Sequence, residues 1–278
     1  MLFRSVSGLS SSQVKALTAD QLTEFDANQI KSLRADGVAQ LTDTQLTAIS
    51  TADLQQMTSA QVSSINTTAL AAMASDVLSQ LTSTQVGMLT STQAKALTAD
   101  QLKEFSSDQV KSLSAAAIGA LTAAQINGID SADIATMETA QIAAISTTAL
   151  TTMDEALVAE FTAGQLAALS TAQSKALNTL QIAALDSTQL AAFETQDIAV
   201  MTATQINAMD STAYDELTTD QIQAISTAAI KDLNDDHVTT LTTDQMAAIT
   251  VAQAKALTAA QLTAMSDTQL EKLGTQQI

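Results

Sequence analysis

The chain has 278 residues, a formal net charge of −18, and no Cys, Pro or Trp. The negative charge argues against nucleic acid and anionic membrane surfaces as partners, because both need clustered Lys or Arg. Without Cys there is no disulfide framework, and without a window of 18 uninterrupted apolar residues we expect no membrane insertion.

The first nine residues, Met1 to Leu9, precede the repeat that fills the rest of the chain. They are too short and too polar for a secretory signal or a transmembrane span. We interpret residues 1–9 as an N-terminal edge or incomplete cap.

From Ser10 to Leu273 the sequence is a run of 33 octads, followed by the fragment 274–278. Position one is Ser, Thr, Asp or Asn in 29 octads, and position four is Gln in 21. Position five is almost always aliphatic, and position eight is Leu, Ile, Met or Phe throughout. Such a fixed short period predicts one repeat domain over 10–278. The stop in mid-octad predicts a fragment of a longer array.

Each octad carries the start signal of a helix. The Ser/Thr-x-x-Gln spacing is that of a capping box, in which the first side chain and the Gln each bond the other residue's backbone N–H. We predict structural capping roles at three pairs in particular: Thr98 with Gln101, Thr82 with Gln85, and Thr258 with Gln261.

The charges follow the same period. Of the 29 acidic residues 22 lie at positions one to four, and nine of the 11 basic residues lie at positions six or seven. This is the order that a helix dipole favours, restarted with every octad. A long helix or a β-solenoid would not bury positions five and eight together. We therefore predict an all-α solenoid of very short helices, one per octad, with positions two, three and six outside and three to four helices per turn.

A second, longer period spans ten octads. Position five is Val14, Ala94, Ser174 and Ala254 at this spacing, which indicates a crowded site. Octads without Gln at position four also recur in step: Gly37, Ala117 and Asp197; Asp53, Asp133 and Ala213; Ala69, Ala149 and Ala229; Val77, Leu157 and His237. Two interpretations stay open, namely duplication of an 80-residue unit, or ten octads that close a whole number of superhelical turns.

The residue types that could carry chemistry have structural interpretations. His237 stands where Gln normally caps, and its neighbours Asp235 and Asp236 are too few to hold a metal ion. Tyr214 replaces an aliphatic residue at position five, so we expect a core aromatic. With one His there is no Ser/His/Asp set, and Ser and Thr are used as caps. We expect no enzyme activity, no cofactor and no metal site.

Two surface hypotheses remain. The repeated Gln could form a polar ladder on the solenoid surface, where it would bind carbohydrate or peptide. The regular Thr and Ala positions could instead form an ice-binding surface.

The octads Thr82–Leu89 and Thr258–Met265 resemble the octapeptide-repeat segments of large bacterial secreted or cell-surface proteins. The resemblance covers residues 10 to 278 and implies an exported, adhesin-like or structural role with protein or glycan surface contacts. We therefore expect a non-catalytic structural spacer or interaction scaffold of a bacterial extracellular protein. A ligand-binding solenoid for glycan or peptide is the alternative.

Overall fold

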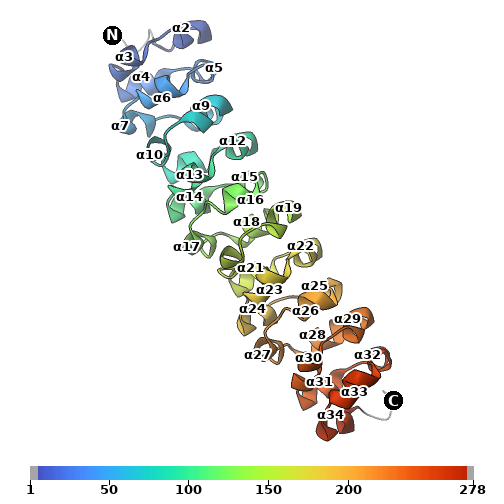
Figure 1. The fold of residues 1–278 in the computed structure, drawn as a ribbon. Helices are drawn as coiled ribbons and strands as arrows, with labels where there is room; N and C mark the ends of the chain where they lie inside the picture. The colour runs from blue at the N-terminus through green and yellow to red at the C-terminus, as the bar shows by residue number, and fades with distance from the viewer. Residues whose placement is uncertain (1–5, 274–278) are drawn as a thin grey trace. The chain divides into compact units, whose positions relative to one another are not determined.

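A computed structural model describes residues 6–273 (Figure 1), and in this range the chain is helical with no strand. It contains 33 helices, α2 to α34, each of four to six residues. One helix forms per octad. The predicted all-α solenoid of very short helices is confirmed.

The chain divides into two compact units, Met1–Ala149 and Leu150–Ile278, which are described separately. The helices of the first unit are α2 (Ser11–Lys15), α3 (Ala19–Thr23), α4 (Ala27–Ser32), α5 (Ala35–Val38), α6 (Asp43–Thr47), α7 (Thr51–Leu54), α8 (Ser59–Ser64), α9 (Thr67–Ala72), α10 (Ser75–Leu78), α11 (Ser83–Val86), α12 (Ser91–Ala96), α13 (Ala99–Lys103), α14 (Ser107–Ser112), α15 (Ala115–Ile118), α16 (Ala123–Ile126), α17 (Ser131–Ile134) and α18 (Thr139–Ala144).

Helix α19 (Thr147–Thr151) includes residues of both units. The helices of the second unit are α20 (Glu155–Val158), α21 (Ala163–Ala167), α22 (Thr171–Ala176), α23 (Thr179–Ala183), α24 (Ser187–Ala191), α25 (Thr195–Val200), α26 (Ala203–Ile206), α27 (Ser211–Tyr214), α28 (Thr219–Ala224), α29 (Thr227–Lys231), α30 (Asp235–Thr240), α31 (Thr243–Ala248), α32 (Val251–Ala256), α33 (Ala259–Ala264) and α34 (Asp267–Lys272).

Between α12 and α13 the chain has two extended residues, whereas other helices, such as α13, first add a residue of helical conformation, Glu104, with φ −82° and ψ −4°. Leu97, which ends α12, has φ −61° and ψ 147°, and Thr98, which caps α13, has φ −85° and ψ 160°. No described residue has a positive φ. The helices therefore end without the left-handed glycine that commonly stops a helix, and so the chain needs few glycines.

Between three and four helices make one turn of the solenoid in each unit. Helices pack against the helix three places further along the chain, as α12 does against α15 and α28 does against α31. Figure 1 shows such helices in neighbouring turns. Side-chain bonds also join helices four places apart, as between Gln101 of α13 and Leu70 of α9, which agrees with the predicted three to four helices per turn.

Positions five and eight form the core of each unit. Leu102 is 0% exposed and Phe105 is 3% exposed, whereas Asp100 and Lys103 of the same octad face solvent. This is the predicted inside and outside pattern. The buried Gln101 at position four was not predicted. Burial of two large apolar side chains per octad offsets the ordering of a helix too short to be stable alone.

The 80-residue period keeps both of its interpretations. Helices pack at a spacing of three octads and ladder bonds join helices four octads apart, so one turn takes between three and four octads. Ten octads can close three turns within that range. The geometric interpretation and the duplication of an 80-residue unit therefore both stay predictions.

The described residues test the predictions for the chain ends and for the domain count only in part. Residues 1–5 of the N-terminal edge and the fragment 274–278 lie outside the described residues. A single solenoid over 10–278 also stays a prediction, because the two units are not placed relative to one another.

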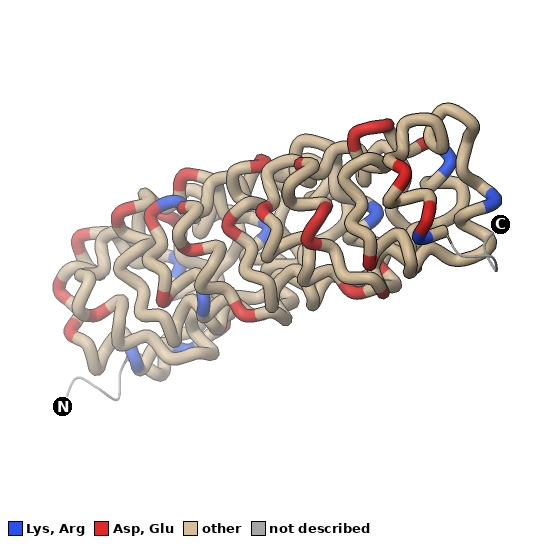
Figure 2. Tube along the Cα trace, turned by 90° about the horizontal axis from the view of Figure 1, so that it is seen from below, with Lys and Arg blue, Asp and Glu red and all other residues tan. Residues whose placement is uncertain are grey.

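Acidic residues are spaced along the trace of both units (Figure 2). Two ion pairs form among residues 6–273, Arg34 with Asp36 at 3.0 Å and Lys111 with Glu138 at 3.2 Å, and all four side chains are largely exposed. Exposed pairs of this kind contribute little to stability. The excess negative charge therefore stays largely solvated.

Candidate functional site

The buried Gln side chains at position four are the repeated polar feature of the fold. Gln101 Oε1 accepts from the Thr98 N–H at 2.9 Å, and the Gln101 N–H donates to Thr98 Oγ1 at 3.1 Å. Its Nε2 donates to the carbonyl oxygens of Leu70 at 2.9 Å and Met73 at 2.8 Å. One side chain thus caps its own helix and also bonds the C-terminal end of α9 in the preceding turn.

The same register recurs in both units. Each such Gln donates to the carbonyl 28 residues earlier and to one 30 or 31 residues earlier. We call these residues the amide ladder: Gln45, Gln61, Gln85, Gln93, Gln101, Gln109, Gln125, Gln141, Gln181, Gln189, Gln205, Gln221, Gln245, Gln253, Gln261 and Gln269. The carbonyls at a helix C-terminus have no partner within the helix, and the ladder supplies one.

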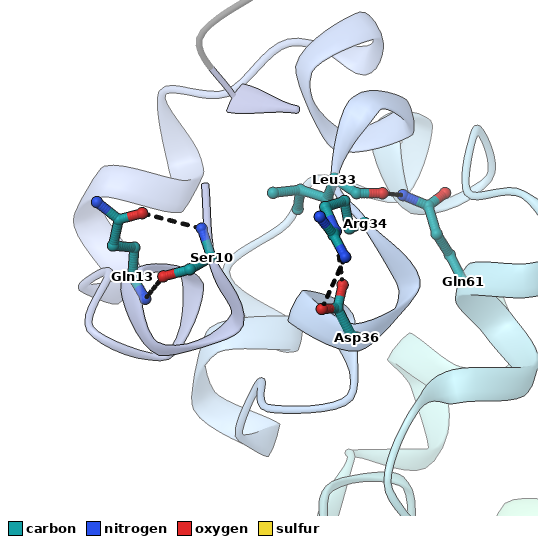
Figure 3. A network of polar contacts seen from close by, with 6 residues as sticks. All are labelled: Ser10, Gln13, Leu33, Arg34, Asp36 and Gln61. Carbon is teal, nitrogen blue, oxygen red and sulfur yellow. Dashed lines mark hydrogen bonds and ion pairs between the residues drawn. The ribbon is translucent and has the colours of Figure 1, made fainter. Parts of the chain in front are cut away.

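Figure 3 shows these bonds close to the first helices. Ser10 and Gln13 form a capping box, with the Ser10 N–H 2.9 Å from Gln13 Oε1. Gln61 reaches from α8 to the Leu33 carbonyl oxygen at 2.8 Å. Each kind of bond satisfies backbone groups at one end of a short helix.

The three predicted capping pairs all lie at helix N-termini with both bonds of the capping box formed. Thr98 caps α13 with Gln101. Thr82 accepts from the Gln85 N–H at 3.2 Å, and Thr258 from the Gln261 N–H at 3.2 Å. The inter-turn bonds of these Gln residues were missed, because the octad pattern does not reveal which octads are neighbours in space.

The hypothesis of a surface Gln ladder is wrong for the amide ladder. Gln101, Gln181 and Gln253 are 1%, 0% and 1% exposed. Their side chains are packed between turns, and those of Gln101 and Gln181 donate to backbone carbonyls. A glycan or peptide could not reach these amides without separating the turns.

Some octads without Gln replace its inter-turn bond by another group. In the octad with Ala69, the cap residue Asn66 donates its Nδ2 to the Ala39 carbonyl at 3.1 Å and to the Leu41 carbonyl at 2.8 Å. In the octad with Asp133, the carboxylate accepts from the Ser107 hydroxyl at 2.5 Å. These two octads therefore form an inter-turn bond without Gln.

In the octad of His237, two residues provide the two bonds that a ladder Gln would make. Its ring Nε2 lies 3.1 Å from the Met209 carbonyl oxygen, 28 residues earlier, where a ladder amide would bond. The Asn234 N–H, which a Gln would cap, donates instead to Asn207 Oδ1 at 3.0 Å. His237 therefore replaces the inter-turn bond of Gln but not its capping bond, which corrects the expectation of a capping substitute.

Tyr214 packs against His237 in the core of the second unit. The two ring centroids lie 4.5 Å apart in an edge arrangement, and Tyr214 is 0% exposed, so the predicted core aromatic is confirmed. Burial raises the pKa of the Tyr214 hydroxyl and lowers the pKa of the His237 ring. Around neutral pH both groups are therefore held in their neutral forms.

The crowded fifth position also has a structural explanation. A Cβ on Gly37 would come within 2.9 Å of the Val14 Cγ2. The position-five residue of one octad thus shares space with the position-four residue of the octad three places further along, and equivalent pairs are Ala94 with Ala117 and Ser174 with Asp197. At this pair the absence of a Cβ on Gly37 leaves room for the Val14 side chain.

Shallow grooves between turns recur at equivalent places. One of about 360 Å³ is lined by residues that include Gln55, Ser83, Glu104 and Asp108. Others lie at Asn66 and Thr68 in the first unit and at Glu194 and Asp220 in the second. Their linings correspond when the numbering is shifted by whole octads. No unique cleft stands out among them.

No group of three or more His, Cys, Asp or Glu among residues 6–273 is placed to hold a metal ion. No helix of the described chain has the length and apolar character to cross a membrane.

These features define the class of protein, which is a helical solenoid built from short repeats. Comparison with protein families gives a match to the ALTTAQ repeat at residues 158–193 and 190–227. The starts of the two matches are offset by four whole octads, so the matches are in register with the helices. Comparison with curated proteins gives no match.

Proposed function

We propose that the chain is a non-catalytic structural spacer or interaction scaffold. The main support is the amide ladder, because it uses the most regular polar groups of the sequence to bond one turn to the next. Each ladder Gln adds two or three hydrogen bonds between turns, and each bond contributes about 1 kcal/mol. An array of this kind holds its length through many small equivalent contacts rather than through one site.

The grooves between turns favour the same proposal. They are shallow, repeated and equivalent, so a partner protein would meet similar surfaces along each unit. The negative charge around them disfavours acidic partners. A bacterial extracellular or cell-surface setting rests on the octapeptide-repeat resemblance.

A replacement experiment tests the scaffold proposal. In the cell that makes the protein, residues 10–273 are exchanged for an equal number of identical octads with the sequence of Thr98–Phe105. The exchange keeps length and ladder but removes His237, Tyr214, Asp197 and every other exception. A scaffold predicts that this array restores whatever phenotype deletion of the segment causes.

Failure of a folded, expressed array to restore the phenotype would overturn the scaffold proposal. The alternative, a ligand-binding solenoid, has its own readout. On glycan and peptide arrays it predicts saturable binding to the natural chain and none to the identical-octad array. The scaffold proposal predicts no difference between the two.

A further inference from the structure

Asp197 occupies the ladder position of α25 but provides no amide. Its side chain is 0% exposed, and neither carboxylate oxygen has a hydrogen-bond partner among the described residues. By the register of the ladder, the carbonyls of Leu166 and Leu169 in the preceding turn correspond to this position. A Gln at this position would donate to these two carbonyl oxygens, whereas the ionised Asp197 carboxylate has two oxygen atoms that can only accept.

Ser174 is the polar neighbour of Asp197. It is 0% exposed on α22, where most octads have an aliphatic residue, and its hydroxyl donates to the Ser170 carbonyl at 3.2 Å. Burial raises the pKa of Asp197, and the Ser174 hydroxyl opposes this only in part. Two polar residues thus lie together in the core.

The charged groups near Asp197 do not neutralise it. The Glu194 carboxylate at the start of α25 acts on it with the same sign of charge. Lys175 on α22 and Asp220 on α28, the two helices packed against α25, are exposed. No cation is therefore held against the Asp197 carboxylate by the packed elements.

The equivalent pair ten octads earlier is Ala94 and Ala117, which are both 0% exposed and carry no polar side-chain atom. Two small apolar residues thus fill this place in the first unit. The acid in the second unit is not needed to complete the fold.

We propose that Asp197 is a proton-controlled lock between α25 and the preceding turn of the Leu150–Ile278 unit. As the neutral acid, it donates its O–H to a carbonyl oxygen of that turn and closes the break in the amide ladder. When the proton leaves to solvent, the Ser174 hydroxyl is the donor beside the buried carboxylate, and this hydroxyl already donates to the Ser170 carbonyl oxygen. The contact between α22 and α25 then loosens.

The direction of the effect follows from the raised pKa of the folded state. The acid stays protonated in the fold at pH values where the unfolded chain has lost its proton. The stabilisation is therefore full below the ordinary Asp value and is lost as the pH rises towards the folded pKa. The lock closes in acid and opens as the solution becomes neutral.

Hydrogen-exchange mass spectrometry of the full chain tests the lock. Exchange in peptides from α22 and α25 is compared between the natural chain and Asp197→Asn from about pH 4 to about pH 8. The intrinsic exchange rates are the same in both chains and cancel. The ratio of the exchange rate in the natural chain to that in the variant therefore reports the opening of α22 and α25. We expect it to rise by up to roughly tenfold per pH unit and then level off. A ratio that does not change with pH would overturn the proposal.

Two further variants keep the test decisive. Ser174→Ala with Asp197→Ala recreates the Ala94 and Ala117 pair and should show no pH-dependent opening at α22 and α25 beyond intrinsic exchange. Ala94→Ser with Ala117→Asp should bring the pH dependence to α12 and α15 in the first unit. Failure of the first variant to remove the dependence would contradict the lock.

A metal ion is the competing occupant of the same position. At fixed pH and ionic strength, exchange is measured in Na⁺, K⁺ and Ca²⁺. The proton lock predicts the same ratio in all three. Slower opening in one of them, only when Asp197 is present, would assign the position to that cation and overturn the proposal.

Discussion

Residues 82–105 and 194–217 are each three octads long, one stretch in each unit, yet their buried polar groups are bonded differently. In the first stretch every octad has a ladder Gln, and each amide donates to two carbonyls. In the second stretch Gln205 alone does so. The other two ladder positions are Asp197 and Ala213.

The two stretches also differ in how many buried side-chain oxygens lack a hydrogen-bond partner. Among the described residues, buried side-chain oxygens without a partner belong to Asp197, Tyr214 and Asp215, all in the second stretch. Both stretches form helices of four to six residues at the octad period. The octad thus makes the helices with or without Gln, while the ladder decides whether the polar groups between turns are satisfied.

The largest expected effect comes from placing a charge in the regular stretch. Leu102→Asp buries a carboxylate at a core position that is 0% exposed, and should cost about 4 kcal/mol or more. Native-state hydrogen exchange of α10 to α16 measures the loss. Lys103→Asp, at an exposed neighbouring position, is the control. Equal effects of the two substitutions would contradict the assigned core.

Removal of one ladder amide separates inter-turn bonding from capping. Gln101→Ala removes the capping bond and both inter-turn bonds, and should cost about 2–4 kcal/mol locally. Gln13 forms the same capping box, but its exposed side chain makes no inter-turn bond within the described range. Gln13→Ala should therefore cost about 1 kcal/mol or less. Hydrogen exchange of α9 and α13, compared with α2, checks the difference.

Tyr214→Phe, in the less regular stretch, should stabilise the protein, whereas the two preceding substitutions in the regular stretch should destabilise it. The Tyr214 hydroxyl is buried without a partner, so its removal should stabilise the second unit by about 1 kcal/mol. Chemical denaturation of the natural chain and the variant measures the change. Destabilisation by Phe would instead show that the hydroxyl has a partner, such as a bound water.

The smallest expected effect is the pH dependence at His237. Burial lowers its pKa despite the opposing carboxylates of Asp236, Asp215 and Asp210. The unfolded chain therefore binds the proton at a higher pH than the fold, and stability falls as the pH drops below about 6.5, by at most about 1.4 kcal/mol per unit. His237→Gln should remove this dependence. Denaturation midpoints of both chains across the pH range provide the measurement.

The sequence by itself determined the local structure. The cap residue, the apolar residues at positions five and eight, and the charge order all act within one octad, so Thr98, Leu102 and Phe105 could be assigned from spacing alone. The 80-residue period also pointed to crowding at Val14 and its equivalents.

Only the tertiary structure decided how octads are brought together. It set the number of helices per turn, placed Gln101 against the carbonyls of Leu70 and Met73, and brought Ser174 beside Asp197. The physical reason is that these contacts join residues about three to four octads apart, and their register depends on the pitch of the turn. No single octad encodes that pitch, because it results from the packing of every core side chain against the turns before and after it.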